Sequence, residues 1–322
     1  MNLIKVIMGS LVFGGMLSLH AFAQSYPSKP IRIVFPFSAG TGGDAMSRII
    51  AQKLSEALKQ PVVVDPRPGA NGIVGTDIAA KSPPDGHTII FTTTNTQTIN
   101  PNLYSKLPYD PIKDFIPITK IGSTPYFLVL GNHVSANSLK EFVSLAKANP
   151  GKYSLGYTTS TPQMTGELFR IIAGINLLFV PYKTSAAAYT DLNTGQLDAM
   201  LETVISSRPQ IKAGRMKAIA VTSARRSVLM PEIPTIAESG YPGFESDTLV
   251  AAFAPTGTPK EIIATLHDQI VRIVQIPEIK EQIQQIGIEV ITSTPQELGD
   301  MINRDVVKWA RVIKEANIPK AN

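Results

Sequence analysis

Small and hydroxyl-bearing residues follow an apolar run near the start of the chain. Ile31–Phe35 is rich in β-branched and aromatic residues, the loop Ser38–Gly43 follows Pro36, and a helical pattern begins at Asp44. A strand, a glycine loop and a helix start direct unpaired backbone N–H groups and the positive end of a helix dipole at one point. This chemistry binds an anion. An ordinary strand-to-helix turn is the alternative, because the loop lacks the Gly-Lys-Ser/Thr ending of a P-loop.

The second half of the chain repeats this arrangement with hydroxyl groups. The predicted strand Tyr153–Tyr157 is followed by Thr158–Thr161 and then by a predicted helix over Met164–Ala173. Four adjacent hydroxyls supply side-chain hydrogen-bond donors in addition to the backbone amides. If the two loops face each other across a cleft, they can hold one anionic group from both sides. A Thr/Ser-rich surface turn is the alternative.

The elements that must position these loops alternate between short apolar strands and amphipathic helices. Such alternation predicts an α/β fold with largely parallel sheets, in which ligands lie beyond the carboxyl ends of the strands. Thr94 lies at such an end, in the polar run after the strand His87–Phe91. The other main predictions are the strands Pro61–Val64, Tyr126–Leu130, Leu177–Val180, Leu197–Leu201 and Ala218–Val221, and the helices Ile73–Lys81, Leu139–Ala148, Ala186–Thr194, Lys260–Val274, Pro277–Ile286 and Pro295–Glu315.

The N-terminus has the pattern of a secretory signal peptide. Lys5 precedes an apolar stretch over Val6–Leu19, and Ala21–Ala23 has the small-x-small form of a cleavage site. We therefore expect cleavage after residue 23 and a periplasmic protein. A membrane anchor is the alternative, although the stretch is short for a bilayer span. The chain has 0 cysteines, which excludes disulfides, a thiol nucleophile and Cys-ligated zinc.

Charge and motif content exclude several functions. The formal net charge is +5, and it becomes +4 when Lys5 leaves with the signal (5 − 1 = 4). The basic residues are scattered rather than clustered, so a nucleic-acid partner is not expected. His87, His133 and His267 are far apart and lack metal-ligand spacing. No Gly-x-Ser-x-Gly elbow or catalytic carboxylate pair is visible, so we expect no enzyme, no metal and no cofactor.

Many short segments, in order along the whole mature chain, resemble one family. The resemblance is to the periplasmic solute-binding proteins of the tripartite tricarboxylate transporters, the Bug or TctC-like family. The matching segments are Tyr26–Arg32, Pro36–Asp44, Val62–Gly72, Pro84–Thr88, Asn100–Tyr104, Leu107–Asp110, Val180–Lys183, Ala220–Ser223, Pro231–Thr235 and Ala254–Pro259. The resemblance implies a type II periplasmic-binding-protein fold, two α/β lobes with a ligand cleft between them. Residues 24–122 with 245–322 would form lobe 1, and residues 123–244 lobe 2.

The resemblance also implies a function. It predicts a monomer that captures a small organic carboxylate by lobe closure and delivers it to a tripartite tricarboxylate-type membrane transporter. Two alternatives remain open: a ligand-loaded sensor that docks on a signalling receptor, and a periplasmic enzyme on the same fold. The predicted ligand-binding residues are Phe37, Ser38, Ala39, Gly40, Thr41, Gly42, Gly43, Asp44, Thr94, Thr158, Thr159, Ser160, Thr161, Lys183 and Glu202.

Several of these residues have a second interpretation. Asp44 is either a helix cap or a ligand contact, and its negative charge favours the cap. Lys183 is either a counter-charge in the cleft or a solvated loop lysine. Glu202 either meets an amine or hydroxyl of the ligand or supports the hinge. Phe37 either covers the ligand or packs, and Trp309 is expected in the core.

Overall fold

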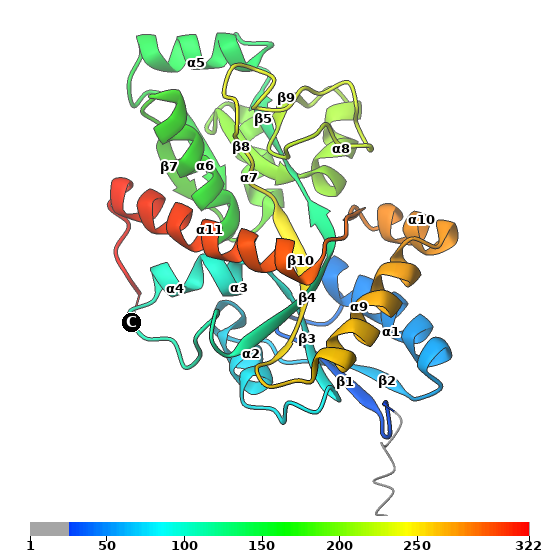
Figure 1. Cartoon of the computed structure of the whole chain (residues 1–322). Helices are drawn as coiled ribbons and strands as arrows, with labels where there is room; N and C mark the ends of the chain where they lie inside the picture. Colours follow the sequence, from blue (N-terminus) through cyan, green and yellow to red (C-terminus); the bar gives the residue numbers. More distant parts are fainter. Residues whose placement is uncertain (1–25, 322) are drawn as a thin grey trace, which may run out of the picture.

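The computed structural model describes residues 26–321, so the predicted signal peptide lies outside the described residues. The strands form two separate sheets with helices on their faces, one group of elements above the other in Figure 1. The strand orders are β11-β4-β10-β3-β1-β2 and β7-β6-β8-β5-β9. We call the elements around the six-stranded sheet the first lobe and those around the five-stranded sheet the second lobe. The α/β fold is therefore confirmed.

In the first lobe only half of the sheet is parallel. β1 pairs in parallel with β2 and β3, whereas β10 runs antiparallel to both β3 and β4. The prediction of a largely parallel sheet was therefore wrong for the first lobe. The chain returns to this sheet after the second lobe, and the returning strand β10 runs antiparallel to its neighbours. The strands are β1 (Ile31–Phe35), β2 (Val62–Pro66), β3 (Thr88–Thr93), β4 (Phe115–Thr124), β10 (Thr248–Pro255) and β11 (Glu289–Val290).

Two helical layers cover this sheet and bury its alternating apolar side chains. α1, α9 and α10 pack on one face, around Ile33, Ile50 and Leu266. α2 and the start of α11 pack on the other face, around Val34, Phe253 and Leu298. The helices are α1 (Gly42–Leu58), the 3-10 turn η1 (Ala70–Gly72), α2 (Ile73–Ala80), α3 (Asn95–Thr98), α4 (Asn100–Leu103), α9 (Lys260–Val274), α10 (Pro277–Gln285) and α11 (Pro295–Glu315).

The second lobe repeats this layering on a smaller sheet. β6, β7 and β8 run parallel, and β5 is antiparallel to β8 and β9. One face packs on α5 and α6, the other on α7 and α8. The elements are β5 (Tyr126–Gly131), α5 (Leu139–Ala148), β6 (Ser154–Tyr157), α6 (Ser160–Ala173), β7 (Leu178–Pro181), α7 (Ser185–Thr194), β8 (Ala199–Thr203), α8 (Val204–Lys212) and β9 (Met216–Val221).

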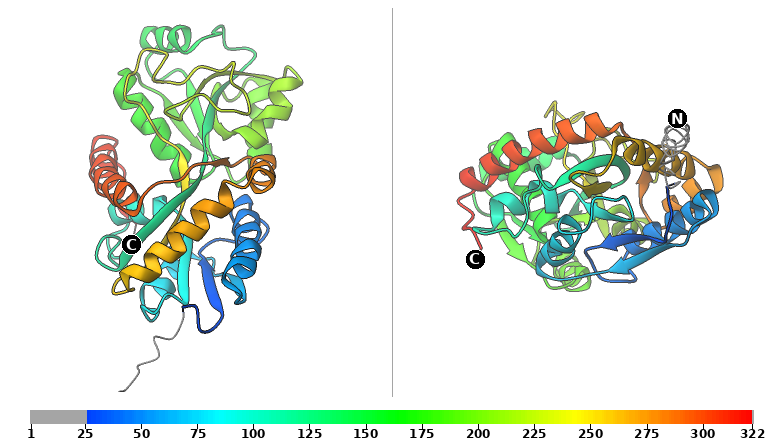
Figure 2. Two further views of the ribbon diagram at one scale, coloured as in Figure 1. Left: turned by 45° about the vertical axis from the view of Figure 1, so that its right-hand side comes forward. Right: turned by 60° about the horizontal axis from the view of Figure 1, so that its bottom comes forward.

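The chain passes between the lobes at two adjacent places. Pro125 separates β4 of the first sheet from β5 of the second, and Ser246 and Asp247 lead back into β10. β4 and β10 are hydrogen-bonded neighbours, so the two crossings lie side by side. Figure 2 shows the lobes joined by these strands.

Helix α11 makes a third connection between the lobes. It lies across their junction in Figure 1, and Trp309, Val312 and Ile313 are buried in the core of the second lobe. The prediction that Trp309 is a core residue is confirmed, since it is 4% exposed.

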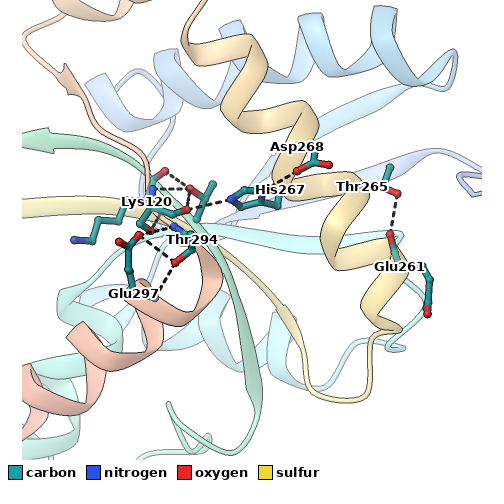
Figure 3. A network of polar contacts seen from close by, with 9 residues as sticks. Lys120, Glu261, Thr265, His267, Asp268, Thr294 and Glu297 are labelled. Carbon is teal, nitrogen blue, oxygen red and sulfur yellow. Dashed lines mark hydrogen bonds and ion pairs between the residues drawn. The ribbon is translucent and has the colours of Figure 1, made fainter.

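Polar contacts fix the start of α11 on the first lobe (Figure 3). Ser293 O accepts a hydrogen bond from the Thr119 hydroxyl at 2.8 Å and lies 3.2 Å from His267 Nε2. Thr294 and Glu297 then form a reciprocal capping box. The Thr294 backbone N–H and hydroxyl, with Lys120 nearby, hold the pKa of Glu297 below its ordinary value. Among residues 26–321, no helix is both long and apolar enough to cross a membrane.

Candidate functional site

The facing edges of the two lobes are built alike. In the first lobe the parallel strands β1, β2 and β3 end at one edge, where α1, α2 and α3 begin. In the second lobe β6, β7 and β8 end at one edge, where α6, α7 and α8 begin. Each edge therefore carries several helix N-termini, whose unpaired N–H groups and dipoles favour an anion.

Two contacts bring these edges together. Asn71 Nδ2, in the turn after β2, donates to Ser160 Oγ at the start of α6, with a distance of 3.3 Å. On the other side Gly287 packs on Ile205 so closely that an added Cβ would lie 2.6 Å from the Ile205 Cβ. Gly42 borders this second contact, since its own added Cβ would lie 3.7 Å from Ile286 O. The loop 38–43 thus lies between two bridges to the second lobe.

The first loop caps α1 differently from the expectation. The N-cap is Thr41, whose hydroxyl accepts from the Asp44 N–H at 3.4 Å. Asp44 lies inside the first turn, and the interpretation of Asp44 as the N-cap was wrong. Its carboxylate instead accepts from the Gly40 N–H at 3.0 Å and from Arg48 Nε at 3.0 Å. The Thr41 and Asp44 side chains thus each accept a backbone N–H of this segment, and together they fix the conformation of the loop.

This arrangement decides which amides of the first loop are available. Burial acts to raise the pKa of Asp44, but the hydrogen bonds from Arg48 and Gly40 hold it below its ordinary value. The Gly40 N–H already donates to this carboxylate and is not available to a ligand. The N–H groups of Gly42 and Gly43, at the first two helical positions, have no acceptor among residues 26–321. Ser38, Ala39 and Thr41 are exposed beside them.

The second loop also differs from its prediction. α6 begins at Ser160 rather than near Met164, with Thr159 as an N-cap that makes no side-chain capping bond. Pro162 has no N–H to donate. The amides of Ser160 and Thr161 have no acceptor in the described part of the chain. At the same helix end Thr158 is partly exposed and Thr159 is exposed.

Phe37 links the first loop to the turn that touches the second lobe. Its ring lies edge-on to Phe35, with centroids 5.6 Å apart, and a Cβ added to Gly72 would lie 3.2 Å from it. Gly72 follows Asn71, the residue that bonds to Ser160. Phe37 packs and is also partly exposed, so both interpretations of this residue remain compatible with its position.

Thr94 and Thr161 lie together in a cavity of about 360 Å³, and they come from opposite lobes. The cavity is bounded by α3, α6, the crossing segment 243–249 and α11, and none of residues 37–44 lines it. Both threonines are buried. They therefore lie at the junction of the lobes on the side of α11, whereas the loop 38–43 lies beside η1 and α10.

Lys183 and Glu202 lie at the same edge of the second lobe but in different surroundings. Lys183 is exposed after β7, and residues 26–321 offer it no ion-pair partner. Glu202, at the end of β8, is 5% exposed and accepts from the Thr203 N–H at 2.7 Å. Burial, with the Glu202 carboxylate nearby, raises the pKa of Tyr189. These contacts favour a supporting role for Glu202.

Comparison with known proteins assigns the chain to a family. Residues 46–318 match the tripartite tricarboxylate transporter family receptor, TctC. The chain belongs to this family. Among the relatives, BugT of Bordetella pertussis is 31% identical over 318 residues, which are 98% of each chain. The resemblance stated from the sequence is therefore confirmed.

Two solved structures share the fold over about nine-tenths of this chain. An R. palustris protein solved with adipate is 31% identical and has a TM-score of 0.75, covering 92% of this chain and 100% of its own. MatC from Rhodopseudomonas palustris, solved with bound malate, is 26% identical and has a TM-score of 0.71. The match covers 89% of this chain and 100% of MatC. Proteins of the TctC family are periplasmic binding proteins that serve a tripartite tricarboxylate transporter.

Some residues that shape this TctC-type site were not predicted. Asn71 has a left-handed backbone with φ +55°, and its side chain also donates to Asn100 Oδ1 at 3.0 Å. Ile205 and Gly287 make the second bridge. The available signal was the Asn-Gly pair in the turn after β2, because Asn tolerates a positive φ and lies at a strand end.

The bond between Asn71 and Ser160 can be measured by a double-mutant cycle. Asn71→Gly keeps the left-handed backbone, and Ser160→Ala removes only the hydroxyl. We expect a coupling of about 0.5–1 kcal/mol in the free energy of unfolding, because one partly exposed hydrogen bond joins the pair. Denaturant unfolding of the four proteins measures it. Additive effects would show that the bond does not hold the lobes together.

Proposed function

We propose that this protein binds a small organic carboxylate between the loops 38–43 and 158–161 and delivers it to the membrane subunits of a tripartite tricarboxylate-type transporter. The observation that carries the proposal is the pair of helix N-termini, one on each lobe, with unpaired amides at Gly42, Gly43, Ser160 and Thr161. The Asn71–Ser160 contact joins the second of these ends to the turn after β2, on which Phe37 beside the first loop packs. The relatives solved with adipate and malate support a carboxylate as the ligand.

Lobe closure provides the mechanism. Each helix end offers N–H donors and a partial positive charge, and one carboxylate has two oxygens with several lone pairs. A ligand held from both sides has more hydrogen bonds in the closed arrangement than in the open one. It therefore shifts the equilibrium toward closure by this difference in affinity. Small or hydroxyl residues line the approach: Ser38, Ala39, Thr41 and Thr159 are exposed, and Thr158 is partly exposed.

The remaining predicted residues take supporting roles in this proposal. Asp44 fixes the first loop through Gly40 and Arg48. Phe37 and Thr94 pack at the edges of the site, and Lys183 supplies positive charge at its rim. Glu202 holds the end of β8 rather than the ligand.

We further propose that residues 1–23 direct export to the periplasm and are cleaved. Residues 24–122 with 245–322, and residues 123–244, would act as the two moving bodies of a monomer. The function is binding without catalysis. In support, the chain belongs to the TctC family, whose members are binding proteins of a transporter.

Thermal unfolding with a panel of carboxylates tests the function. A ligand at about 100 times its Kd adds roughly 2.7 kcal/mol to the free energy of unfolding, so we expect at least one mono-, di- or tricarboxylate to raise the Tm clearly. Calorimetric titration then gives its Kd. Matched amides and esters of the same acids serve as controls without the charge. A folded protein that shows neither a Tm shift nor heat with any member of the panel would contradict the function.

A further inference from the structure

The two crossings between the lobes meet at one carboxyl group. Asp247 lies in the second crossing, immediately before β10. Its Oδ2 accepts from the hydroxyl of Ser123 on β4, at 2.8 Å. Its Oδ1 accepts from the hydroxyl of Thr222, which follows β9, at 3.2 Å. One side chain therefore binds a hydroxyl from each lobe.

Further hydrogen bonds extend this junction into both lobes. The Thr222 hydroxyl also accepts from the Tyr126 N–H at 3.0 Å, and the Tyr126 phenol lies 2.7 Å from the Thr248 hydroxyl. Ser246 is bonded to Thr165 of α6, with their hydroxyl oxygens 2.6 Å apart. Because these bonds span the point about which the lobes would rotate, rotation must alter the surroundings of Asp247.

Charged and titratable side chains face this carboxyl from several elements. Glu245 comes from its own segment, Glu289 from β11 and the Tyr126 phenol from β5. Asp247 also lines the cavity under α11, which gives water a route to it. The charged residues of that cavity from β4 and α11 are Lys120, Arg304, Asp305, Lys308 and Arg311.

Burial raises the pKa of Asp247 from 3.8 to about 7, against the hydrogen bonds from Ser123 and Thr222 and with a further rise from Glu245 and Glu289. The group therefore exchanges its proton near neutral pH. In the unfolded chain, where water surrounds the side chain, the Asp247 carboxyl group is already ionised at pH values well below neutrality. Less water around it favours the protonated form, and more water favours the carboxylate.

We propose that Asp247 is a proton-linked hinge residue, which takes up a proton when the lobes close and so makes carboxylate capture tighter in mildly acidic surroundings. The proposal rests on the proposed binding function, because closure on an anion both dehydrates the junction and adds negative charge near it. Both effects favour the neutral acid. By linkage, the affinity then falls by up to about tenfold for each pH unit above neutrality.

Interlobe distance in the unliganded protein tests the hinge without any ligand. The chain has 0 cysteines, so Ala57→Cys on α1 and Lys140→Cys on α5, both exposed, can carry a fluorophore pair. We expect a shorter mean separation at pH 6 than at pH 8, with a midpoint near pH 7. The same pair with Asp247→Asn should show no such transition. An unchanged transition in the Asn variant, or none in the parent pair, would overturn the proposal.

A second variant tests the role of Asp247 even where Asp247→Asn fails to fold. Ser123→Ala keeps the acid but removes a hydrogen bond that favours its ionised form, so the midpoint should move to higher pH. A midpoint that stays in place, or moves to lower pH, would contradict the role of Asp247.

Calorimetric titration with adipate at pH 7 separates this inference from the function. In buffers of different ionisation enthalpy, uptake of up to one proton per adipate is expected for the natural chain and none for Asp247→Asn. Equal proton uptake in both would overturn the proposal. Absence of adipate binding would weaken the proposed function for this acid, and the fluorophore pair would still decide the role of the hinge residue.

Discussion

Replacing Gly42 by proline is expected to weaken carboxylate binding about 10- to 100-fold while leaving the fold intact. Gly42 is the first residue of α1, a position that proline tolerates because its missing N–H has no helical partner. Thr41 before it has φ −78° and ψ 161°, which suits a residue preceding proline. The substitution therefore deletes one amide donor, and a hydrogen bond to a charged group contributes about 1.5–3 kcal/mol. Calorimetric titration with the best ligand of the panel measures the loss.

Gly42→Ala is the matched control, since it keeps the N–H. Its Cβ would make an ordinary contact, 3.7 Å from Ile286 O, so little change in affinity or Tm is expected. Gly43 is a poorer choice, because a Cβ there would lie 2.9 Å from the buried Phe35 ring. If the proline variant binds as tightly as the natural chain, the first loop does not hold the anion through this amide.

Trp309→Ala is expected to lower the free energy of unfolding by about 3–5 kcal/mol. Trp309 is 4% exposed and joins α11 to the core of the second lobe, so its removal leaves a large cavity between the lobes. It is the single tryptophan of the chain, so unfolding of this variant has to be followed by circular dichroism.

A neighbouring position on α11 provides the control. Val307 is 70% exposed, and Val307→Ala should change the free energy of unfolding by no more than about 0.5 kcal/mol. Trp309→Phe, which keeps an aromatic ring, should fall between the two. A loss below about 1 kcal/mol for Trp309→Ala would mean that α11 does not hold the second lobe through this side chain.

The strands and helices that carry the two loops could be predicted from the sequence. Ile31–Phe35 was predicted with the bounds that the structure gives for β1, and the helix predicted over Leu139–Ala148 matches α5. These segments have a clear period of 2 or 3.6 and clear stop residues, so local pattern and tertiary packing agree. The family resemblance then indicated the two-lobed arrangement.

The strands that join the lobes were not predicted. The register of β10 against β4 shifts twice, between Val250 and Ala251 and between Ala252 and Phe253. β10 is also buried on both faces, so its sequence does not alternate. Bulges and two-sided burial both remove the period-2 pattern on which the prediction of a strand depends.

Several contacts of the site could not be predicted from the sequence, because they depend on the folded backbone or on residues far apart in the chain. Thr41 and Asp44 are both good N-cap residues, and only the backbone of the folded loop decides between them. Asn71 and Asp247 act through partners 89 and 124 residues away in the chain, namely Ser160 and Ser123. Contacts of such separation leave no periodic signal in a single sequence.

A crystal structure of the protein grown with the carboxylate that raises its Tm most tests the central claim directly. The account predicts one carboxylate within hydrogen-bonding distance of the Gly42 or Gly43 amide and, at the same time, of the Ser160 or Thr161 amide. A ligand held by one lobe alone, or lodged under α11 away from all four amides, would contradict it.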